Sequence, residues 1–312
     1  MQSPGRGKSK GSKMSIEMII SQIFNGLSLS SILLLIALGL SITFGIMGVI
    51  NFAHGEFLMV GAYTAYVLQK IFHGQDGGTY FLISLPVAFL VAGIVGFILE
   101  KSLIRFLYGR PYEGILATWG LSLIFQQTAR NIFGANNVEV TSPSWLAGGI
   151  ELMNGLQLPY NRLFIIAVAA LSVFVMYLYI YNSSAGRRMR AVMQNRDMSA
   201  CMGIKTKSVD STTFAIGCGL AGVAGCVVSL LGSIGPSTGQ NYIVDAFMVV
   251  VLGGVGKLSG TIAGAIMIGM ASPLFEYVTT SSMGKVIVFA LVIVFLQWKP
   301  SGLFALKTRA LD

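Results

Sequence analysis

Long apolar runs dominate the chain and are separated by short polar stretches. The runs lie at about 19–47, 57–72, 80–99, 114–133, 161–182, 209–232, 244–256, 261–279 and 285–298. Their hydrophobic positions do not alternate with polar ones, as the strands of a membrane barrel would require. A helix satisfies its own backbone in lipid and needs about 20 residues to cross the hydrocarbon core. The pattern therefore predicts an all-α polytopic membrane protein with about eight to nine transmembrane or half-spanning helices.

The composition strengthens this prediction. Of the 312 residues, 54% are hydrophobic and 11% are charged, whereas a soluble domain carries about 25% charged residues. The net charge of +9 is gathered in clusters at 101–110, 187–207 and 299–309. Short basic clusters between apolar runs are typical of cytoplasmic loops. This distribution argues against nucleic-acid binding and indicates that the lipid bilayer surrounds the chain.

The same clusters divide the chain into parts. We expect a disordered basic tail over 1–15, a permease-like membrane domain over 16–306 and a short cytoplasmic tail over 307–312. Within the membrane domain, the basic loop 183–208 is predicted to be cytoplasmic. Loop 134–160 has few Lys or Arg residues and is predicted to form an external hairpin or cap.

The orientation of the N-terminus stays open. If 100–112 is cytoplasmic, a single crossing over 19–47 places the start of the chain outside, although the first residues are basic. One interpretation is that this tail is not native and that the chain starts at Met14. The other is that the 19–47 segment bends near Asn25 and Gly26 and adds a partial crossing.

Two glycine-containing stretches interrupt the apolar runs. GVINFAHGEF lies at 48–57, and GGVGKLSG lies at 253–260 with Gly253, Gly254 and Gly256. They occur in the first and the second half of the chain. A pair of interrupted helices in corresponding halves indicates the central site of a transporter. We therefore predict helix breaks near 48–56 and 253–260.

Polar side chains near the first break are candidates for a solute pathway. Intramembrane ionisable residues usually face a cavity or a partner. The candidates are Asn51, His54 and Glu56 at the break and Thr118, Gln126 and Gln127 in the fourth run. An alternative is structural: Asn51 would cap the next helix, and the amides and hydroxyls would bond neighbouring helices. His54 and Glu56 lack a third ligand, so no metal site is predicted.

Motifs for catalysis are not found. The sequence has no complete phosphate-binding loop, since Gly256 and Lys257 are followed by Leu258 rather than Ser or Thr. It has no hydrolase signature, no catalytic residue set and no cofactor motif. The cysteines Cys201, Cys218 and Cys226 follow no metal spacing. The chain is therefore predicted to be no enzyme but a channel, a gradient-driven carrier or one subunit of a pump.

The loop GRRMRAVMQNRDMSACMGI (186–204) has an amphipathic helical pattern that ends at Gly203. A helix of this kind in a cytoplasmic loop suits a groove on a partner protein. Together with GVINFAHGEFLMVGAY and VVVLGGVGKLSGTIAGA, it resembles the branched-chain amino acid type of ABC importer permease. The resemblance covers residues from about 20 to 306.

The resemblance implies a bacterial cytoplasmic-membrane protein that forms a heterodimer with a second permease subunit. Two cytoplasmic ATPases and an external solute-binding protein complete such a system. The ATPases would contact the coupling residues Ala191, Asn195, Arg196, Asp197, Ala200, Gly203 and Ile204.

Segments such as FGANNVEVTSPSWLAGG (133–149) and LPYNRLFII (158–166) resemble most the urea importers of this family. The sequence therefore predicts ATP-driven urea import. A permease for branched-chain or other amino acids is the first alternative. A stand-alone channel or ion-coupled carrier for small neutral solutes, which needs no coupling loop, is the second.

Overall fold

The computed structural model describes residues 16–48, 50–72, 78–153 and 156–304. The predicted tails 1–15 and 307–312 lie outside these residues. The elements are α1 (Ile16–Met47), α2 (His54–Ile71), α3 (Thr79–Ser102), η1 (Ile104–Leu107), α4 (Pro111–Phe133), η2 (Ser144–Leu146), β1 (Gly149–Met153), β2 (Leu156–Pro159), α5 (Tyr160–Asn182), α6 (Ser184–Gln194), α7 (Arg196–Cys201), α8 (Thr206–Val228), α9 (Thr238–Gly253), α10 (Leu258–Val278) and α11 (Ser281–Trp298).

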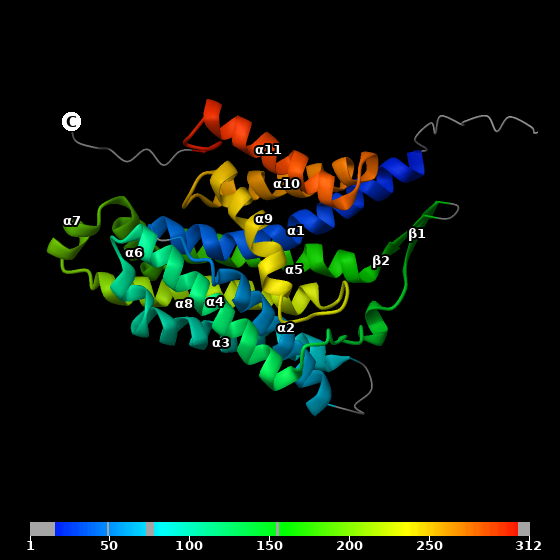
Figure 1. Ribbon diagram of the computed structural model, residues 1–312, viewed down its shortest axis with the longest axis horizontal. Helices are drawn as coiled ribbons and strands as arrows, with labels where there is room; N and C mark the ends of the chain where they lie inside the picture. The colour runs from blue at the N-terminus through cyan, green and yellow to red at the C-terminus, as the bar shows by residue number, and fades with distance from the viewer. Residues whose placement is uncertain (1–15, 49, 73–77, 154–155, 305–312) are drawn as a thin grey trace, which may run out of the picture.

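The long helices form one bundle with two distinct ends (Figure 1). At one end, here called the hairpin end, strands β1 and β2 pair beside the start of α1. At the other, here called the basic end, lie α6, α7 and the basic residues that precede α4 and α8. The prediction of an all-α polytopic membrane protein is confirmed. In the described part of the chain, helices are long and the only named strands are this short pair.

Helix α1 makes a single uninterrupted crossing. It runs continuously through Asn25 and Gly26, so the bend considered there is wrong. A Cβ on Gly26 would lie 3.1 Å from the Met270 Cα, which shows that the glycine permits close packing on α10. The Asn25 side chain accepts a hydrogen bond from Arg162 at the start of α5. The start of α1 therefore lies at the hairpin end, opposite α6 and α7.

Helices α1 and α8 form the centre of the bundle. Their most apolar stretches are 78% and 83% buried, against 17% to 28% for α3, α5 and α11. Glycines let α8 approach its neighbours backbone to backbone. A Cβ on Gly225 would lie 1.8 Å from the Leu58 carbonyl oxygen of α2, and one on Gly61 would lie 1.9 Å from the Gly222 carbonyl oxygen. The glycine spacing on α8 thus fixes how deeply α2 packs into the bundle.

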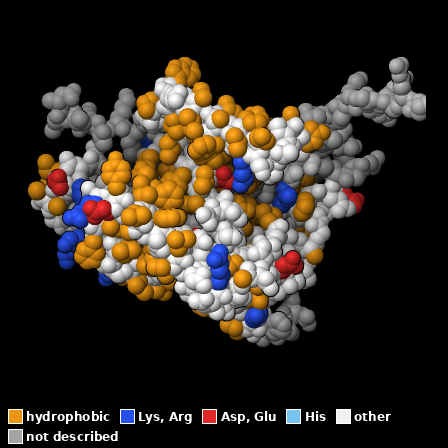
Figure 2. Space-filling view, viewed as in Figure 1, with side chains coloured by type: hydrophobic (Ala, Val, Ile, Leu, Met, Phe, Trp, Pro, Cys, Tyr) orange, Lys and Arg blue, Asp and Glu red, His pale blue; other side chains and the backbone are white. Residues whose placement is uncertain are grey.

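The outer helices expose apolar side chains around the bundle. Ile94 and Ile98 on α3, Phe174 on α5 and Val294 on α11 are all more than half exposed. Figure 2 shows a broad hydrophobic area across the middle of one face, with Lys and Arg side chains gathered near α6 and α7. Six of the described helices are long and apolar enough to span a membrane. Such a surface is suited to lipid rather than to water.

Both predicted helix breaks are present. Helix α1 ends at Met47 and α2 begins at His54. Helix α9 ends at Gly253 and α10 begins at Leu258, after four intervening residues of which Lys257 is the N-cap. Gly254 has a φ of +98°, which disfavours any residue with a side chain. A segment after α11 closes this break, since the Leu303 and Phe304 amides donate to the carbonyls of Leu252 and Gly253 at 2.8 and 3.1 Å. These two bonds satisfy backbone carbonyl groups that the C-terminal end of α9 would otherwise leave without a partner.

The loop predicted to be an external hairpin contains the strands β1 and β2, which pair antiparallel. The strand-like run Val138–Val140 lies outside this pair. Val138 instead makes an isolated bridge with Ile234, in the connection between α8 and α9. The loop therefore covers the hairpin end and joins the two halves of the chain there.

Replacement of Gly225 by Ala tests the packing of α2 on α8. The new methyl group has no space against the Leu58 carbonyl, and overpacking of this kind costs about 1–3 kcal/mol. We expect a lower thermal unfolding midpoint for the purified variant. Gly120→Ala is the matched control, because a methyl group at Gly120 would meet no atom within 4 Å and alanine favours a helix. Equal midpoints for Gly225→Ala and the wild type would contradict the packing described here.

Candidate functional site

A buried carboxylate joins α2 to α4. Glu56, in the first turn of α2, is 1% exposed. Its Oε1 atom accepts hydrogen bonds from the Ser122 hydroxyl at 2.7 Å and from the Gln126 amide at 2.9 Å, both on α4. Ser122 and Gln126 are themselves buried. A buried carboxylate with amide and hydroxyl partners, in a helix bundle built for lipid, makes this cluster the candidate site of the chain.

The break before α2 positions this carboxylate. The Asn51 Oδ1 atom accepts from the Ala53 amide at 3.0 Å and so shapes the turn that starts the helix. Asn51 is therefore a turn former two residues from the helix, and the N-cap position is Ala53. The Phe52 amide donates to the Thr118 hydroxyl at 3.2 Å, which adds a second contact between the break and α4. These bonds hold the start of α2 against the polar side of α4.

Several polar atoms around the break keep hydrogen-bonding capacity. Within the described residues, Glu56 Oε2, Asn51 Nδ2 and both ring nitrogens of His54 are buried and make no hydrogen bond of normal geometry. Glu56 and Asn51 offer an anionic acceptor and an amide donor at the break, and the His54 ring faces the Ile36 backbone of α1. Buried polar groups are costly when they lack partners. Such groups are suited to a polar solute or to water that passes the break.

Five of the six predicted pathway residues lie in this region, and one does not. All five are buried, and Asn51, Glu56, Thr118 and Gln126 lie at the contact of α2 with α4, whereas the His54 ring lies against the Ile36 backbone of α1. Gln127 is exposed on the opposite side of α4, where its amide donates to Asn131 at 3.2 Å.

Ser122 was missed, although it stands midway between Thr118 and Gln126. The spacing of four residues places all three on one helix face, and this periodicity could have identified it.

An apolar groove lies beside the carboxylate cluster. It has a volume of about 430 Å³ and is lined mainly by α2 and α4. Met59, Tyr63 and Phe125 lie within one or two turns of Glu56 and Ser122. None of Glu56, Ser122 and Gln126 lines this groove, and Val87 and Val91 of α3 complete its wall. A groove of this kind is suited to the hydrocarbon part of a solute.

The predicted coupling loop forms two helices rather than one. Asn195 adopts an extended conformation between α6 and α7, and its Oδ1 atom caps α7 by accepting from the Met198 amide at 2.9 Å. Asparagine competes for backbone hydrogen bonds in this way, and so it ends one helix and starts the next. Gly203 follows α7 with a φ of +82° and gives the chain its turn toward α8.

The coupling residues occupy different environments. Asp197 and Ala200 are exposed on α7, Ala191 is half-buried on α6, and Ile204 packs against the core. Met198 and Met202 are 61% and 77% exposed. Exposed methionines give α7 an adaptable apolar surface that fits a protein groove.

A network of charged side chains ties α7 to the bundle. Arg196 pairs with both carboxylate oxygens of Asp210, which is fully buried at the start of α8. The Arg196 guanidinium also lies 5.4 Å from the centre of the Tyr108 ring. The Tyr108 hydroxyl donates to Glu100 at 3.0 Å, and Glu100 is bound by Arg105 at 3.3 Å. A chain of contacts therefore runs from α7 through η1 to α3 and α8.

The Tyr108 phenol remains protonated in this network. Burial and the nearby Glu100 and Asp210 carboxylates raise its pKa well above the ordinary value for tyrosine. A neutral phenol donates its proton to Glu100, which is fully buried and accepts a further bond from Ser211 of α8. Sequence reasoning missed Glu100, Tyr108 and Asp210, because only the fold brings these distant positions together.

No group of three His, Cys, Asp or Glu residues able to hold a metal ion occurs within the described residues. No solved structure matches the chain.

Comparisons with known proteins give a consistent family. Residues 22–296 match the family model described as branched-chain amino acid transport system / permease component. The chain is 30% identical to the permease BraD of Pseudomonas aeruginosa over 91% of this chain and 95% of that protein. It is 30% identical to LivH of Escherichia coli K12 over 91% and 94%, and 26% identical to LivM of the same strain over 88% and 68%.

These relatives are named as permease proteins of high-affinity branched-chain amino acid transport systems. They are transport subunits and not enzymes. The extent of the family match and the multi-helical fold, with its several membrane-spanning helices, agree on one assignment. The chain is a multi-pass inner-membrane protein and belongs to the permease family of branched-chain amino acid ABC transport systems.

Proposed function

We propose that this chain is the translocating subunit of an ATP-driven importer, in which the break at α2 and the polar face of α4 form part of the solute route. The observation that carries the proposal is the buried Glu56 carboxylate. One of its oxygens is held by α4, and the other is uncommitted among the described residues. In a permease, such a group supports a role in solute passage.

Access to this route requires α4 to move. Glu56, Ser122 and Gln126 are shielded from solvent in this arrangement. Helix α4 contacts the rest of the bundle mainly through α2 and η1, whereas α8 contacts α1, α2 and α3 extensively. A helix with few contacts separates from the bundle at the lowest cost in free energy. Displacement of α4 from α2 would expose the carboxylate and the neighbouring apolar groove together.

The energy for this movement would come from ATPases that dock at the basic end. The positive-inside rule supports a cytoplasmic position for this end. Helix α7 supplies an exposed Met-containing surface there, and Arg196 links it to Asp210 of α8. Helix α8 in turn contacts α2 through Gly222 and Gly225. A displacement of α7 by a bound ATPase would therefore be transmitted through α8 to α2, the helix that carries Glu56.

The remaining partners are those implied by the family. A second permease subunit would complete a heterodimer, as the paired names LivH and LivM suggest for the relatives from Escherichia coli. A solute-binding protein would deliver the solute at the hairpin end, where β1, β2 and the 134–148 segment form an ordered external surface.

Branched-chain amino acids are the first candidate solutes, since the relatives named above carry this substrate in their names. The site chemistry supports the same choice. The Glu56 carboxylate would attract an α-ammonium group, and the groove of Met59, Tyr63 and Phe125 would receive an aliphatic side chain. Urea is the second candidate, on the resemblance of segments 133–149 and 158–166. The Ser122 and Gln126 side chains would suit its amide and carbonyl groups.

Uptake by cells that lack the gene separates the two candidates. Radiolabelled leucine and radiolabelled urea are supplied in parallel, with the gene restored on a plasmid as control. We expect loss of leucine uptake with urea uptake unchanged. Loss of urea uptake alone would assign the second candidate, and normal uptake of both would contradict the proposed substrates.

Energy coupling is tested by reconstitution. Liposomes with this chain and its second permease but without ATPases should not move solute. Full transport in their absence would identify a channel or an ion-coupled carrier, and the importer proposal would be wrong.

Glu56→Gln tests the solute route. The substitution keeps the size of the side chain and removes the charge that receives the Ser122 and Gln126 bonds. Hydrogen bonds to charged groups contribute about 1.5–3 kcal/mol, so uptake should fall by about tenfold or more. Glu113→Gln is the matched control, because this exposed carboxylate at the start of α4 pairs with the exposed Arg110, away from the Glu56 cluster. If cells with the Glu56→Gln variant took up solute at the wild-type rate, Glu56 would have no role in the solute route.

The Arg196–Asp210 pair is tested by a double-mutant cycle. Each single variant, Arg196→Gln or Asp210→Asn, leaves one charge without its partner and should reduce both the yield of folded protein and transport. The neutral double variant should recover folded protein, whereas solute-stimulated ATP hydrolysis stays at least about fivefold low. If the double variant recovered both the yield of folded protein and the solute-stimulated ATP hydrolysis, the pair would stabilise the fold without transmitting movement. The exposed Arg110–Glu113 pair serves as the control cycle.

A further inference from the structure

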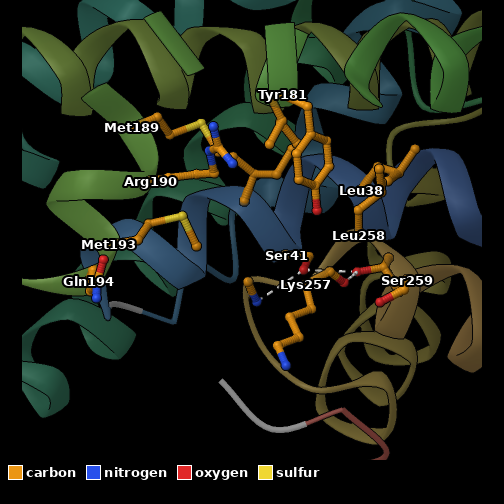
Figure 3. A pocket seen from close by; sticks show the side chains of 14 residues that line it. Leu38, Ser41, Tyr181, Met189, Arg190, Met193, Gln194, Lys257, Leu258 and Ser259 are labelled. Carbon is orange, nitrogen blue, oxygen red and sulfur yellow. Dashed lines mark hydrogen bonds between the residues drawn. The ribbon is translucent and has the colours of Figure 1, made fainter. Parts of the chain in front are cut away.

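Polar cavities lie at both ends of the bundle. One cavity at the basic end lies between α1, α6 and the turn between α9 and α10 (Figure 3). Two of its polar side chains already have partners within the protein. The Arg190 guanidinium lies 5.0 Å from the centre of the Tyr181 ring. The Ser41 hydroxyl accepts hydrogen bonds from the Gly256 amide at 3.3 Å and from the Thr261 hydroxyl at 2.9 Å.

The cavity at the other end, here called the hairpin-end cavity, is different. It lies between α1, the start of α5, the first half of α9 and the end of α10. Its volume is about 420 Å³, and sites for small organic molecules commonly measure about 300–1,000 Å³. None of the residues that line it belongs to the Glu56 cluster. The cavity is therefore a separate place where a solute could bind.

Two opposite charges line the hairpin-end cavity from different helices. Arg162 lies in the first turn of α5, and Glu276 lies in the last turn of α10. Both side chains are half-buried. In the described part of the chain, they form no ion pair with each other or with any other residue. A cation and an anion that line one cavity without neutralising each other offer a partner to each charged group of a zwitterion.

Neighbouring helices position both charged side chains. The Arg162 Nη1 atom donates to the side chain of Asn25 on α1, whereas Nε and Nη2 make no hydrogen bond within the described residues. The fork of a guanidinium matches the two oxygens of a carboxylate. The stem of Glu276 rests on Gly284 of α11, where an added Cβ would lie 2.7 Å from the Glu276 Cγ atom. The two charges are therefore held in place and remain available to a ligand.

Ser28 adds a hydroxyl group that the protein does not use. It lines the cavity from α1 and is 2% exposed, and its Oγ atom makes no hydrogen bond within the described residues. The nearby Ser30 and Ser31 instead donate to the α1 carbonyls of Gly26 and Leu27 at 2.7 and 2.8 Å. Such bonds are the usual choice of a serine within a helix. A buried hydroxyl without a partner therefore indicates a polar ligand.

Apolar side chains border these polar groups. Leu29 of α1, Leu231 in the connection before α9 and Pro273 of α10 line the same cavity. Leu231 is 42% exposed. A small apolar surface beside two opposite charges is suited to a molecule with a charged end and a short hydrocarbon part.

We propose that the hairpin-end cavity binds a zwitterionic amino acid with an aliphatic side chain before the solute enters the membrane. Arg162 binds the α-carboxylate, Glu276 binds the α-ammonium group and Ser28 donates to a carboxylate oxygen. The aliphatic side chain lies against Leu231. This inference rests on the proposed import of branched-chain amino acids, and it adds an outer binding site that is distinct from Glu56. Urea carries no charge and would gain little from such a site.

The start of α5 links this cavity to the loop above it. Asn161, next to Arg162, donates to the Ser142 hydroxyl at 3.1 Å. Ser142 belongs to the 134–148 segment, which is part of the surface proposed for the solute-binding protein. A protein docked on this segment would therefore release its solute beside the arginine that binds the carboxylate.

Leucine uptake by cells with the complete transporter tests the two charges. The initial rate is measured at leucine concentrations below KM, where it reports kcat/KM, and is corrected for the amount of transporter in the membrane. Arg162→Gln and Glu276→Gln should each lower this rate at least about tenfold, because each removes a hydrogen bond between charged groups. Arg162→Lys keeps the charge and should retain more uptake than Arg162→Gln. Wild-type rates in both Gln variants would overturn the proposal.

Two matched variants control for the loss of a charge as such. Arg130→Gln removes an exposed cation near the end of α4, and Glu113→Gln removes an exposed carboxylate at its start. Neither residue lines the hairpin-end cavity. Both variants should take up leucine at rates near that of the wild type. A tenfold loss in either control would mean that uptake responds to surface charge in general, and the assignment to this cavity would be wrong.

Leucine binding to the purified transport complex, without the solute-binding protein, keeps the test decisive if a variant folds poorly. Unlabelled isoleucine should displace radiolabelled leucine. Isopentylamine lacks the carboxylate and 4-methylpentanoate lacks the ammonium group, so each should require at least about tenfold higher concentrations. Glu56→Gln should retain leucine binding. Equal displacement by either analogue, no binding of leucine, or its loss in Glu56→Gln would each overturn the proposal.

Failure of the proposed function would give a different result. If leucine uptake does not depend on this gene, the proposed import of branched-chain amino acids is wrong, and the inference about the cavity is wrong with it. If leucine uptake depends on the gene and both Gln variants transport leucine normally, only the inference about the hairpin-end cavity is wrong.

Discussion

Close backbone contact between α8 and its neighbours is the constraint on which the rest of the structure depends. In lipid the hydrophobic effect does little to hold helices together, so van der Waals contact between backbones must do so. Gly217, Gly222 and Gly225 allow α1, α3 and α2 to approach α8 at distances that a methyl group would forbid. Because α2 is held in this way, its first turn and the Glu56 carboxylate have a fixed position, whereas α4 makes fewer contacts with the bundle, as the proposed opening of the site requires.

Helix α8 makes a charged contact at its start and uncharged backbone contacts along its middle. At the basic end, α8 begins with Asp210 and Ser211, which bind Arg196 and Glu100. Further along, its glycines meet α2. A rigid helix with a charged contact at one end and a backbone contact in the middle can transmit a displacement without changing its own conformation. The importer mechanism proposed above uses this property of α8.

Much of the fold could be predicted from the sequence, because a lipid environment leaves few alternatives. The apolar runs and the glycine interruptions at 48–56 and 253–260 correspond to helices and breaks, with ends shifted by up to about six residues at α9. The candidate site was found in part for the same reason: Glu56 is an ionisable residue in an apolar setting. Gln127 was chosen by residue type alone, and the helical face it occupies points away from Gln126.

What could not be predicted depends on tertiary structure. The split between α6 and α7 follows from one capping asparagine, which a helical periodicity does not detect. Arg196 and Asp210 are 14 residues apart and Tyr108 and Glu100 are 8 apart, but the bond from Ser211 to Glu100, which joins the two groups, spans 111 residues. The uninterrupted course of α1 brings Gly26 against Met270 of α10, about 240 residues later in the sequence. Single-sequence reasoning has no access to contacts of this range.

The closure of α9 by Leu303 and Phe304 has a consequence for biosynthesis. The carbonyl groups of Leu252 and Gly253 receive these hydrogen bonds from residues that leave the ribosome about fifty residues later. Until α10 and α11 have inserted, the end of α9 must therefore be satisfied by water, which holds it near the membrane surface. The break between α9 and α10 is therefore closed only after both α10 and α11 have been synthesised.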